Sequence, residues 1–415
     1  MKNKPGRSKQ SEGRTGLSRR EFLAGTSGAA MSFSIMKPAL VRGSQANSKI
    51  TLGLIGCGGR GTWIGGLFQQ HGGYEITAAA DYFADRVNAG GDKLNVPASR
   101  RFTGLKGFQR VLDAKVDALA IESPPYFHHE QAAAAVDAGV HVYLAKPMAV
   151  DVPGCRSIEA SAKKAEAKKL AYLIDFQTRT DPYYQEAIRH VKEGNIGRIV
   201  SGEASYVAGS PWPKMIKELE VNPQDPELQV RAWGVSRALS GDIITEQNIL
   251  SIDVMTWVLD QHPLKALGTG GLKSRTQGDV WDHFSVIFWF ADDVLVTFYS
   301  KQYGEGADDI RCEMFGTEGS LDTHYAGEVT IKGKTPYAGG RDGMLYTTGA
   351  VRNIATFHDQ VTSGKFNYST IAPSVRSNLT TILGRTAAYK KAEFTWDELM
   401  RSEERLVPNL AGLKE

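Results

Sequence analysis

The first half of the chain alternates short apolar runs with segments of helical periodicity. The apolar runs cover residues 50–55, 74–80, 116–122, 140–144 and 170–176. The segments between them have the spacing of amphipathic helices, over 63–70, 84–94, 128–138 and 154–169. Strands that alternate with helices in this way predict a parallel, doubly wound sheet with helices on both faces. We therefore expect a Rossmann α/β domain in this part of the chain.

The pattern changes after about Ile196, where strand-like alternation of apolar and polar residues dominates. It covers 200–207, 265–273, 280–290, 294–302 and 311–315. This pattern predicts a C-terminal α+β domain with a large, mostly antiparallel open sheet. Helices are predicted over Glu246–Leu259, 351–362 and 374–391. The segment 210–240, rich in Pro and Trp, either covers a cleft or contacts another subunit.

The first apolar run leads into a glycine-rich turn at residues 56–61, Gly-Cys-Gly-Gly-Arg-Gly. In a dinucleotide site Gly56 permits the tight turn, Gly58 lets the backbone approach the pyrophosphate, and Gly61 lets the next helix pack closely. The N-terminus of that helix presents free N–H groups to the anion. Asp81 follows twenty residues after Gly61, where an acid binds the adenosine ribose and repels a 2′-phosphate. We therefore expect NAD rather than NADP.

The residues before this fold resemble an export signal. Residues 18–23, Ser-Arg-Arg-Glu-Phe-Leu, match the twin-arginine pattern, and a mildly apolar stretch continues to Met36. Ser44-Gln45-Ala46 offers small residues for signal peptidase. We expect a signal peptide over 1–46, the twin-arginine export machinery as a partner, and a periplasmic or cell-envelope location. A disordered basic tail and an uncleaved anchor are the alternatives.

Charge and cysteine content narrow the classes of function. The chain has 49 Lys and Arg and 46 Asp and Glu residues, and nine of the basic and two of the acidic residues lie in residues 1–46. The rest of the chain therefore carries 40 basic and 44 acidic residues, a net charge of about −4. This balance gives no reason to expect nucleic-acid binding. The length suits two domains, a nucleotide-binding domain at 47–176 and a substrate and oligomerisation domain at 177–415. The three cysteines are too few and too widely spaced for a disulfide framework.

Export of a folded protein has a consequence for its cofactor. Free nicotinamide nucleotides are not expected outside the cytoplasm, so a protein that uses one there has to take it up before export and keep it. We therefore expect a tightly bound, prosthetic NAD. Because such a cofactor is not exchanged after each turnover, the reaction has to restore it, either with a second substrate or by oxidising and re-reducing the same molecule.

Four motifs resemble the Gfo/Idh/MocA family, named for glucose-fructose oxidoreductase, inositol dehydrogenase and a rhizopine catabolism protein. They are the glycine turn at 56–61, Ser-Pro-Pro-Tyr-Phe-His at 123–128, Ala-Lys-Pro at 145–147 and Gly-Asp-Ile-Ile-Thr-Glu-Gln-Asn-Ile-Leu at 241–250. The likeness covers residues 50 to about 400. It implies an N-terminal NAD(P) domain, a C-terminal open sheet that forms a sugar site, and a lysine between them. It also favours a homo-oligomer, because open sheets in this family commonly pair across subunits.

The resemblance assigns cofactor contacts to individual residues. They are Gly56, Gly58, Arg60, Gly61, Asp81, Ser123, Pro124, Lys146 and Gln177. Lys146 also suits proton transfer, because hydride leaves a carbinol carbon for the nicotinamide and the hydroxyl proton then needs an acceptor. Pro147 fixes the chain direction directly after this lysine, and a cis peptide bond is one way to do so.

Two positions depart from the family pattern. Ala145 replaces a glutamate that helps to orient the lysine and the cofactor in relatives. Leu250 stands where many relatives carry a catalytic histidine, four residues after an acid that is Glu246 here. This spacing predicts that Glu246 and Leu250 share one helix face. Because leucine cannot accept a proton, either another group does this work or the usual dehydrogenation is altered or absent.

Glu246 and His128 therefore join Lys146 as catalytic candidates. Glu246 equally suits the role of an acid at a helix N-terminus. His128 and His129 open a helix after the Ser-Pro turn, where one is expected to act and the other to lie on the surface.

Arg179, Asp253 and His283 are candidate substrate contacts. Arg179 equally suits an ion pair between domains, and Asp253 a contact on a helix face. Period two on a strand places His283 on the same face as Trp281, where the pair would either bind a sugar or pack in the sheet.

These features predict an NAD(P)-dependent oxidoreductase that acts on a hydroxyl group of a sugar, glycoside or cyclitol. A first alternative is an NAD-dependent glycoside hydrolase that uses transient oxidation and elimination. A second is a catalytically silent protein that binds sugar and nucleotide, which Leu250 suggests. We expect no metal, because no His or Cys cluster in the sequence has the spacing of metal ligands.

Overall fold

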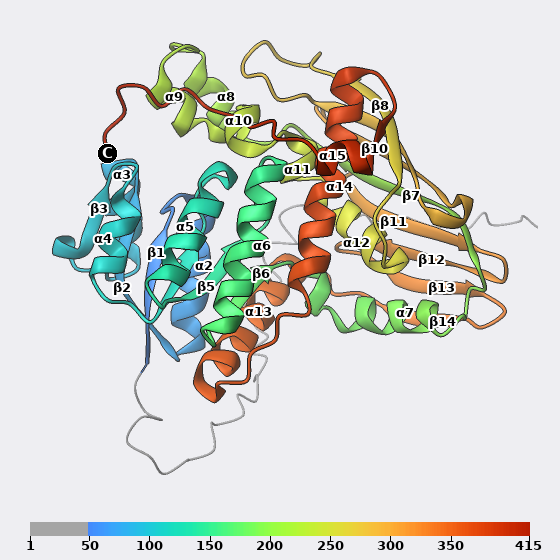
Figure 1. Cartoon of the computed structure of the whole chain (residues 1–415), viewed down its shortest axis with the longest axis horizontal. Helices are drawn as coiled ribbons and strands as arrows, with labels where there is room; N and C mark the ends of the chain where they lie inside the picture. The colour runs from blue at the N-terminus through green and yellow to red at the C-terminus, as the bar shows by residue number, and fades with distance from the viewer. Residues whose placement is uncertain (1–48) are drawn as a thin grey trace, which may run out of the picture. The chain divides into compact units, whose positions relative to one another are not determined.

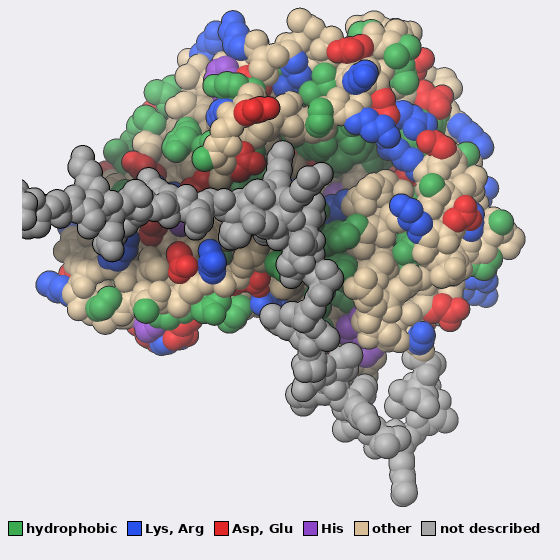
Figure 2. Space-filling view, turned by 180° about the vertical axis from the view of Figure 1, so that it is seen from behind, with side chains coloured by type: hydrophobic (Ala, Val, Ile, Leu, Met, Phe, Trp, Pro, Cys, Tyr) green, Lys and Arg blue, Asp and Glu red, His purple; other side chains and the backbone are tan. Residues whose placement is uncertain are grey.

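A computed structural model describes residues 49–415 (Figure 1). The expected export signal, residues 1–46, lies outside this range. Within the described range no helix has both the length and the apolar character needed to cross a membrane. Basic and acidic side chains are interspersed over the face of the molecule seen in Figure 2. The described chain is built on two sheets, one of six strands and one of nine.

The first sheet is parallel and has the strand order β3-β2-β1-β4-β5-β6. Its strands are β1 (Ile50–Ile55), β2 (Tyr74–Asp81), β3 (Arg101–Thr103), β4 (Ala118–Ile121), β5 (His141–Ala145) and β6 (Tyr172–Asp175). The helices α2 (Gly59–His71), α3 (Ala84–Lys93), α4 (Gly107–Asp113), α5 (Pro125–Asp137) and α6 (Val152–Ala167) connect them. This order confirms the predicted Rossmann fold. Ligands bind at the carboxyl ends of such strands, where the order reverses between β1 and β4.

The second sheet has the order β14-β13-β12-β11-β7-β10-β9-β8-β15 and is antiparallel except between β7 and β10. Its strands are β7 (Ile199–Ala208), β8 (Lys265–Gly271), β9 (His283–Trp289), β10 (Leu295–Gln302), β11 (Asp309–Gly316), β12 (Gly319–His324), β13 (Val329–Gly333), β14 (Tyr337–Gly340) and β15 (Phe394–Thr395). The mostly antiparallel sheet is as predicted. Alternation in β9 turns Phe284, Val286 and Phe288 into the core and Ser285 and Ile287 outward.

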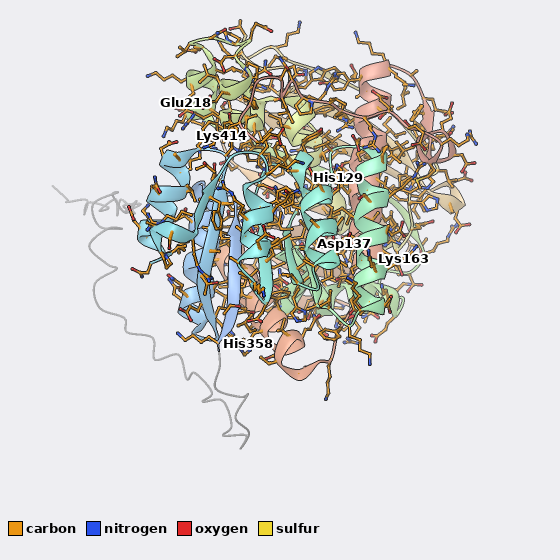
Figure 3. All side chains as sticks on the ribbon, turned by 60° about the vertical axis from the view of Figure 1, so that its left-hand side comes forward. His129, Asp137, Lys163, Glu218, His358 and Lys414 are labelled. Atoms are coloured by element: carbon orange, nitrogen blue, oxygen red, sulfur yellow. The ribbon has the colours of Figure 1, made fainter. Side chains whose placement is uncertain are left out.

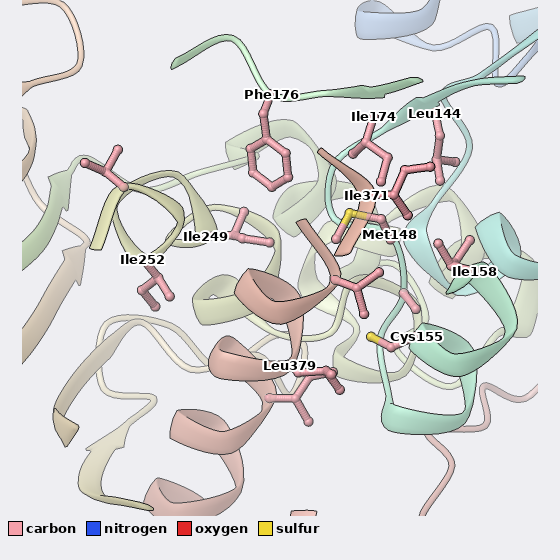
Figure 4. Packing of buried hydrophobic residues seen from close by; sticks show 14 of the residues in the cluster. Leu144, Met148, Cys155, Ile158, Ile174, Phe176, Ile249, Ile252, Ile371 and Leu379 are labelled. Atoms are coloured by element: carbon pink, nitrogen blue, oxygen red, sulfur yellow. The ribbon is translucent and has the colours of Figure 1, made fainter. Parts of the chain in front are cut away.

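Helices of the described chain pack on the inner face of the second sheet. They are α7 (Pro182–Lys192), α12 (Ile249–Leu259) and α14 (Ile371–Lys390). Ile249 and Ile252 of α12 and Leu379 of α14 belong to the same buried cluster as Leu144 and Ile174 of the first sheet (Figure 4). One continuous apolar core therefore joins the two sheets.

The prediction of one helix over 246–259 is wrong about where this helix begins. The structure has two helices there, α11 (Ile243–Glu246) and α12. The N–H of Asn248 bonds to the carbonyl oxygen of Ile243, five residues back, at 2.9 Å, and this wide turn separates the two helices. Glu246 and Leu250 therefore do not lie on one face of a single helix.

Helix α13 (Leu345–Ser363) packs on the first sheet although it lies far along the chain. Its residues Ile354 and Phe357 are buried in the same cluster as Leu52 of β1. The Phe357 ring stands 5.6 Å from the ring of Tyr143, edge to face. The core of the first sheet is thus completed by a helix that comes after β14 of the second sheet in sequence.

Replacing Phe357 by Ala is expected to lower the free energy of unfolding by about 3–5 kcal/mol, because it empties a buried site in this core. Urea unfolding followed by circular dichroism measures the change. Val351→Ala is the matched control, since Val351 lies on the same helix and is 45% exposed; it should stay within about 0.5 kcal/mol of the wild type. Equal shifts for the two variants would contradict the assignment of α13 to this core.

Candidate active site

The glycine turn has the geometry of a phosphate cradle. Gly56 has φ 87°, and a Cβ there would lie 2.5 Å from the carbonyl oxygen of Glu122. A Cβ on Gly61 would lie 1.7 Å from the carbonyl oxygen of Gly56. The fold itself therefore requires both glycines. A Cβ on Gly58 or Gly59 would meet no atom within 4 Å, so the space above the turn is open for a ligand.

Helix α2 begins at Gly59 without a side-chain cap. Its first N–H groups are thus available to an anion. These residues fit a dinucleotide pyrophosphate.

A hollow lies beside this turn, at the carboxyl ends of β1, β2 and β4. Asp81 lines it, together with apolar residues that include Ile55, Leu105, Phe108, Phe127 and Val230. Both carboxylate oxygens of Asp81 accept backbone N–H groups, from Cys57 at 2.8 Å and Phe83 at 3.0 Å. Asp81 thus stands where an acid meets the adenosine ribose in this fold. Ser123 and Pro124 line the same hollow.

Lys146 follows β5 directly, and the Lys146–Pro147 peptide bond is cis. The loop after it is held from α14, because the side-chain oxygen of Asn378 accepts the N–H groups of Met148 at 2.9 Å and Ala149 at 3.2 Å. The Lys146 ammonium donates to the carbonyl oxygen of Glu246 and lies 3.2 Å from its Oε1. Both side chains are about nine-tenths buried. The lysine of the first sheet is therefore paired with an acid from the second half of the chain.

Two residues that the sequence did not single out hold this acid. The Gln247 side-chain N–H donates to Oε2 of Glu246, and its oxygen accepts the hydroxyl of Tyr206 at 2.7 Å. Tyr206 is buried on β7, and this burial raises its pKa above the usual value for tyrosine. Its hydroxyl therefore stays protonated and fixes the orientation of the Gln247 amide. The chain of contacts runs from Lys146 through Glu246 and Gln247 to Tyr206.

A second charged group lies at the carboxyl ends of β4 and β6. Arg60 pairs with Asp175, lies 3.0 Å from Oε2 of Glu122, and donates to the hydroxyl of Tyr346 at 2.7 Å. The side chains of both acids are fully buried. Burial raises the pKa of Glu122 to about 7. Gln177 donates to Asp175 at 2.8 Å, so Arg60 and Gln177, both predicted to contact the cofactor, belong to one buried network.

His128, a catalytic candidate from the sequence, is buried between two backbone carbonyl groups. Its ring is 1% exposed, with Nδ1 2.8 Å from the carbonyl oxygen of Pro147 and Nε2 2.7 Å from that of Ser123. Burial lowers its pKa to about 4. Because both ring nitrogens face backbone carbonyls, neither is free for a substrate. His128 braces the Ser123 turn against the Lys146 loop.

Arg179 and Asp253 are brought together, but they bind each other. The guanidinium of Arg179 makes two hydrogen bonds to the Asp253 carboxylate, at 3.0 and 2.7 Å. Asp253 is fully buried and also accepts the hydroxyl of Ser377 at 2.6 Å. The pair joins the loop after β6 to α12. In this geometry Arg179 and Asp253 form an ion pair with each other, as the alternative role of Arg179 anticipated.

His283 is the first residue of β9. Its side chain is 37% exposed on the outward face of β9, with Nδ1 2.6 Å from Asp282. Trp281 instead stacks on Tyr389 of α14, with ring centroids 3.9 Å apart. Because β9 begins only at His283, strand alternation does not extend to Trp281, and the expectation that the two rings share a face is wrong. Among residues 49–415, no three metal-binding side chains are placed to hold an ion.

The fold and the site together define a dinucleotide-binding protein in which a second sheet brings a carboxylate to the lysine at the cofactor edge. Two family models match the chain. "Oxidoreductase family, NAD-binding Rossmann fold" matches residues 50–172, and "GFO/IDH/MocA C-terminal domain" matches residues 184–322. The protein therefore belongs to the Gfo/Idh/MocA family of oxidoreductases, and its first sheet forms an NAD-binding domain. This confirms the family and the cofactor expected from the sequence motifs.

Individual relatives share less than 30% of their aligned residues with this chain. Levoglucosan dehydrogenase of Pseudarthrobacter phenanthrenivorans is 26% identical over 257 residues, which are 56% of this chain. The match spans 63% of that enzyme, less than two thirds of its length. Inositol 2-dehydrogenase 2 of Saccharopolyspora erythraea is 28% identical over 290 residues, 68% of this chain and 76% of that enzyme. A solved structure of levoglucosan dehydrogenase with NADH and levoglucosan shares the fold, with a TM-score of 0.66, 17% identity and coverage of 84% of this chain and 99% of that one.

Replacing Glu122 by Gln is expected to change how stability depends on pH. The pKa of Glu122 is about 7 in the folded protein against 4.5 for an unperturbed glutamate. The native state therefore binds more protons than the unfolded chain between these values, and wild-type stability falls as pH rises through them. Glutamine does not titrate. As pH rises over that interval, the free energy of unfolding of the variant should therefore increase by up to about 3 kcal/mol relative to that of the wild type.

Urea unfolding at a series of pH values measures this difference. Glu130→Gln is the control, because the Glu130 side chain is 46% exposed. Parallel pH profiles for the wild type and Glu122→Gln would contradict a raised pKa of Glu122.

Proposed function

We propose that the protein is an NAD-dependent oxidoreductase that acts on a hydroxyl group of a sugar, glycoside or cyclitol. The buried pair of Lys146 and Glu246 carries this proposal, because it places an amine at the carboxyl end of β5, beside the dinucleotide site. The names of the relatives support the substrate class, since they are levoglucosan and inositol dehydrogenases.

Each part of the site has a task in this reaction. NAD, when bound, supplies the acceptor for the hydride of a carbinol carbon. The glycine turn and Asp81 bind and orient the dinucleotide. Lys146 accepts or relays the hydroxyl proton at its Nζ, and Glu246 holds this nitrogen in place at 3.2 Å. Leu250 offers no proton acceptor, so Lys146 with Glu246 is the proton-transferring pair in this proposal.

Tight cofactor binding and export belong to the same proposal. The sequence at residues 18–23 resembles a twin-arginine signal, and a folded protein exported by this route would carry its NAD with it. A retained cofactor requires a reaction that restores it. Turnover should therefore depend on a second substrate or leave no net NADH.

A homo-oligomer is also proposed, with a second copy on the outward face of the second sheet. Leu267, Ile287, Leu295 and Tyr299 are all at least 36% exposed on adjacent strands of this face, and such patches often mark contacts between proteins. Ile287→Lys should shift the mass measured by light scattering toward the monomer. Lys332→Glu, an exposed change on the same sheet, is the control. An unchanged mass for Ile287→Lys would contradict this contact.

Replacing Lys146 by Met should abolish most of the activity while leaving NAD bound. Loss of a proton-transferring group costs about 10²- to 10⁴-fold in kcat. The purified enzyme is offered a panel of sugars, cyclitols and glycosides, and reduced cofactor and products are followed separately. Lys163→Met is the control, because Lys163 is exposed on α6 (Figure 3). Equal activity of the two variants would refute the role of Lys146.

The same assay separates the three candidate functions. Oxidised product with reduced cofactor indicates a dehydrogenase. Release of a sugar or aglycone without net NADH indicates a hydrolase that oxidises its substrate only transiently. Bound NAD and bound sugar with neither signal indicate a silent binding protein, the outcome that Leu250 suggests. Nucleotide released on denaturation identifies the cofactor directly.

A further inference from the structure

Two segments that do not belong to the first sheet pack on residues of the hollow that holds Asp81. The first is the α9 segment, residues 226–239, which begins with α9 (Pro226–Arg231). The second is the tail segment, residues 406–415, which follows α15 (Trp396–Met400). Figure 1 shows the tail, in dark red, running from α15 past α8, α9 and α10 to the region of α3.

The α9 segment is anchored on Phe83, which follows β2, and on the first turn of α3. Arg231 makes two hydrogen bonds of 2.9 Å to the carboxylate of Asp85, and its guanidinium lies 3.9 Å above the ring of Phe83. Arg86 donates back to the carbonyl oxygen of Arg231 at 3.0 Å. Val230, between these contacts, is 4% exposed and lines the hollow itself.

The tail segment is anchored on the other side of the same hollow. The carbonyl oxygen of Lys414 accepts the N–H of Leu105 at 2.9 Å, and its ammonium donates to Thr103 at 2.8 Å. Lys414 lies over the nucleotide-binding half in Figure 3. A Cβ on Gly104, where φ is 93°, would lie 2.1 Å from the carbonyl oxygen of Glu415. The glycine is thus required by the close approach of the tail.

The two segments also share apolar contacts with the wall of the hollow. Leu410 and Leu413 of the tail pack on the cluster formed by Phe83, Val230 and Leu239. Phe83 and Val230 are themselves lining residues of the hollow. A molecule that leaves through this side therefore has to displace ionic, hydrogen-bonded and apolar contacts from both segments.

We propose that the α9 segment and the tail segment form a closure that retains NAD by controlling how often the adenosine end of its site opens. This inference rests on the proposed NAD-dependent function. In this arrangement the rate of NAD exchange follows the opening of the closure rather than the contacts of the glycine turn. Residues 226–239 and 406–415 thus make the cofactor a prosthetic group without touching the reacting carbon.

The test follows exchange of bound NAD for isotopically labelled NAD supplied in excess. The full-length protein is purified with NAD, mixed with the label, desalted after set times, and its nucleotide is analysed by mass spectrometry. A Leu410→Ala, Leu413→Ala double variant removes the apolar contacts of the tail. Exchange should become about 10- to 100-fold faster, because the contribution of two partly buried leucines is lost. Val407→Ala, at 69% exposed in the same segment, should exchange like the wild type.

A second variant tests the other segment independently. Arg231→Gln breaks the pair with Asp85 and should also speed up exchange, whereas Lys214→Gln on the neighbouring helix α8 (Pro213–Leu219) should not, because Lys214 is 89% exposed and makes only a loose ion pair. Circular dichroism confirms that each variant is folded.

The outcomes separate this inference from the function on which it rests. A wild-type protein that neither contains nor binds NAD overturns both. A wild-type protein that holds NAD, with exchange in both variants as slow as in their controls, overturns the closure alone and leaves the NAD-dependent function standing.

Discussion

The contact between the lysine loop and α14 is the constraint on which the site depends. Lys146 leaves β5 of one sheet and has to meet Glu246, which is placed by the second half of the chain. Asn378 fixes the loop by accepting two of its backbone N–H groups, and a single apolar core continues behind it from one sheet to the other. Because the packing on both sides of the pair is fixed, a long lysine side chain can be held within 3.2 Å of its partner.

The two departures from the family motifs acquire a common explanation. With Ala145 in place of an acid, the lysine has no carboxylate from its own loop, and Glu246 supplies one from across the interface. Glu246 is the last residue of α11, at the wide turn that the N–H of Asn248 closes. Leu250 then falls on a separate helix and does not share the task of the acid. The carboxylate beside the lysine is therefore the acid at position 246 and not one from the lysine's own loop.

Local patterns in the sequence were sufficient for five of the six strands of the first sheet and for the glycine turn. Strand and helix periodicity depends on burial of one face, and Gly56, Gly61 and Asp81 follow from contacts within one βαβ unit. Tyr206, Gln247 and Asn378 were missed because their partners lie far away in sequence, so spacing carries no signal of them. His128, Arg179 and Asp253 were identified as polar residues near the site. An ion pair was one of the two roles expected for Arg179, but spacing could not show that its partner is Asp253. Strand β3 and helix α4 were missed because they are too short to establish a period.

Helix α13 is synthesised late but belongs to the core of the nucleotide-binding sheet, which is synthesised first. The ribosome completes the six strands of the nucleotide-binding sheet long before residues 345–363 emerge, yet Ile354 and Phe357 of that helix belong to the core behind β1. A nascent chain that ends before α13 therefore leaves the ring of Tyr143 without its neighbour Phe357. Such a chain exposes apolar surface of the nucleotide-binding half until α13 has been synthesised.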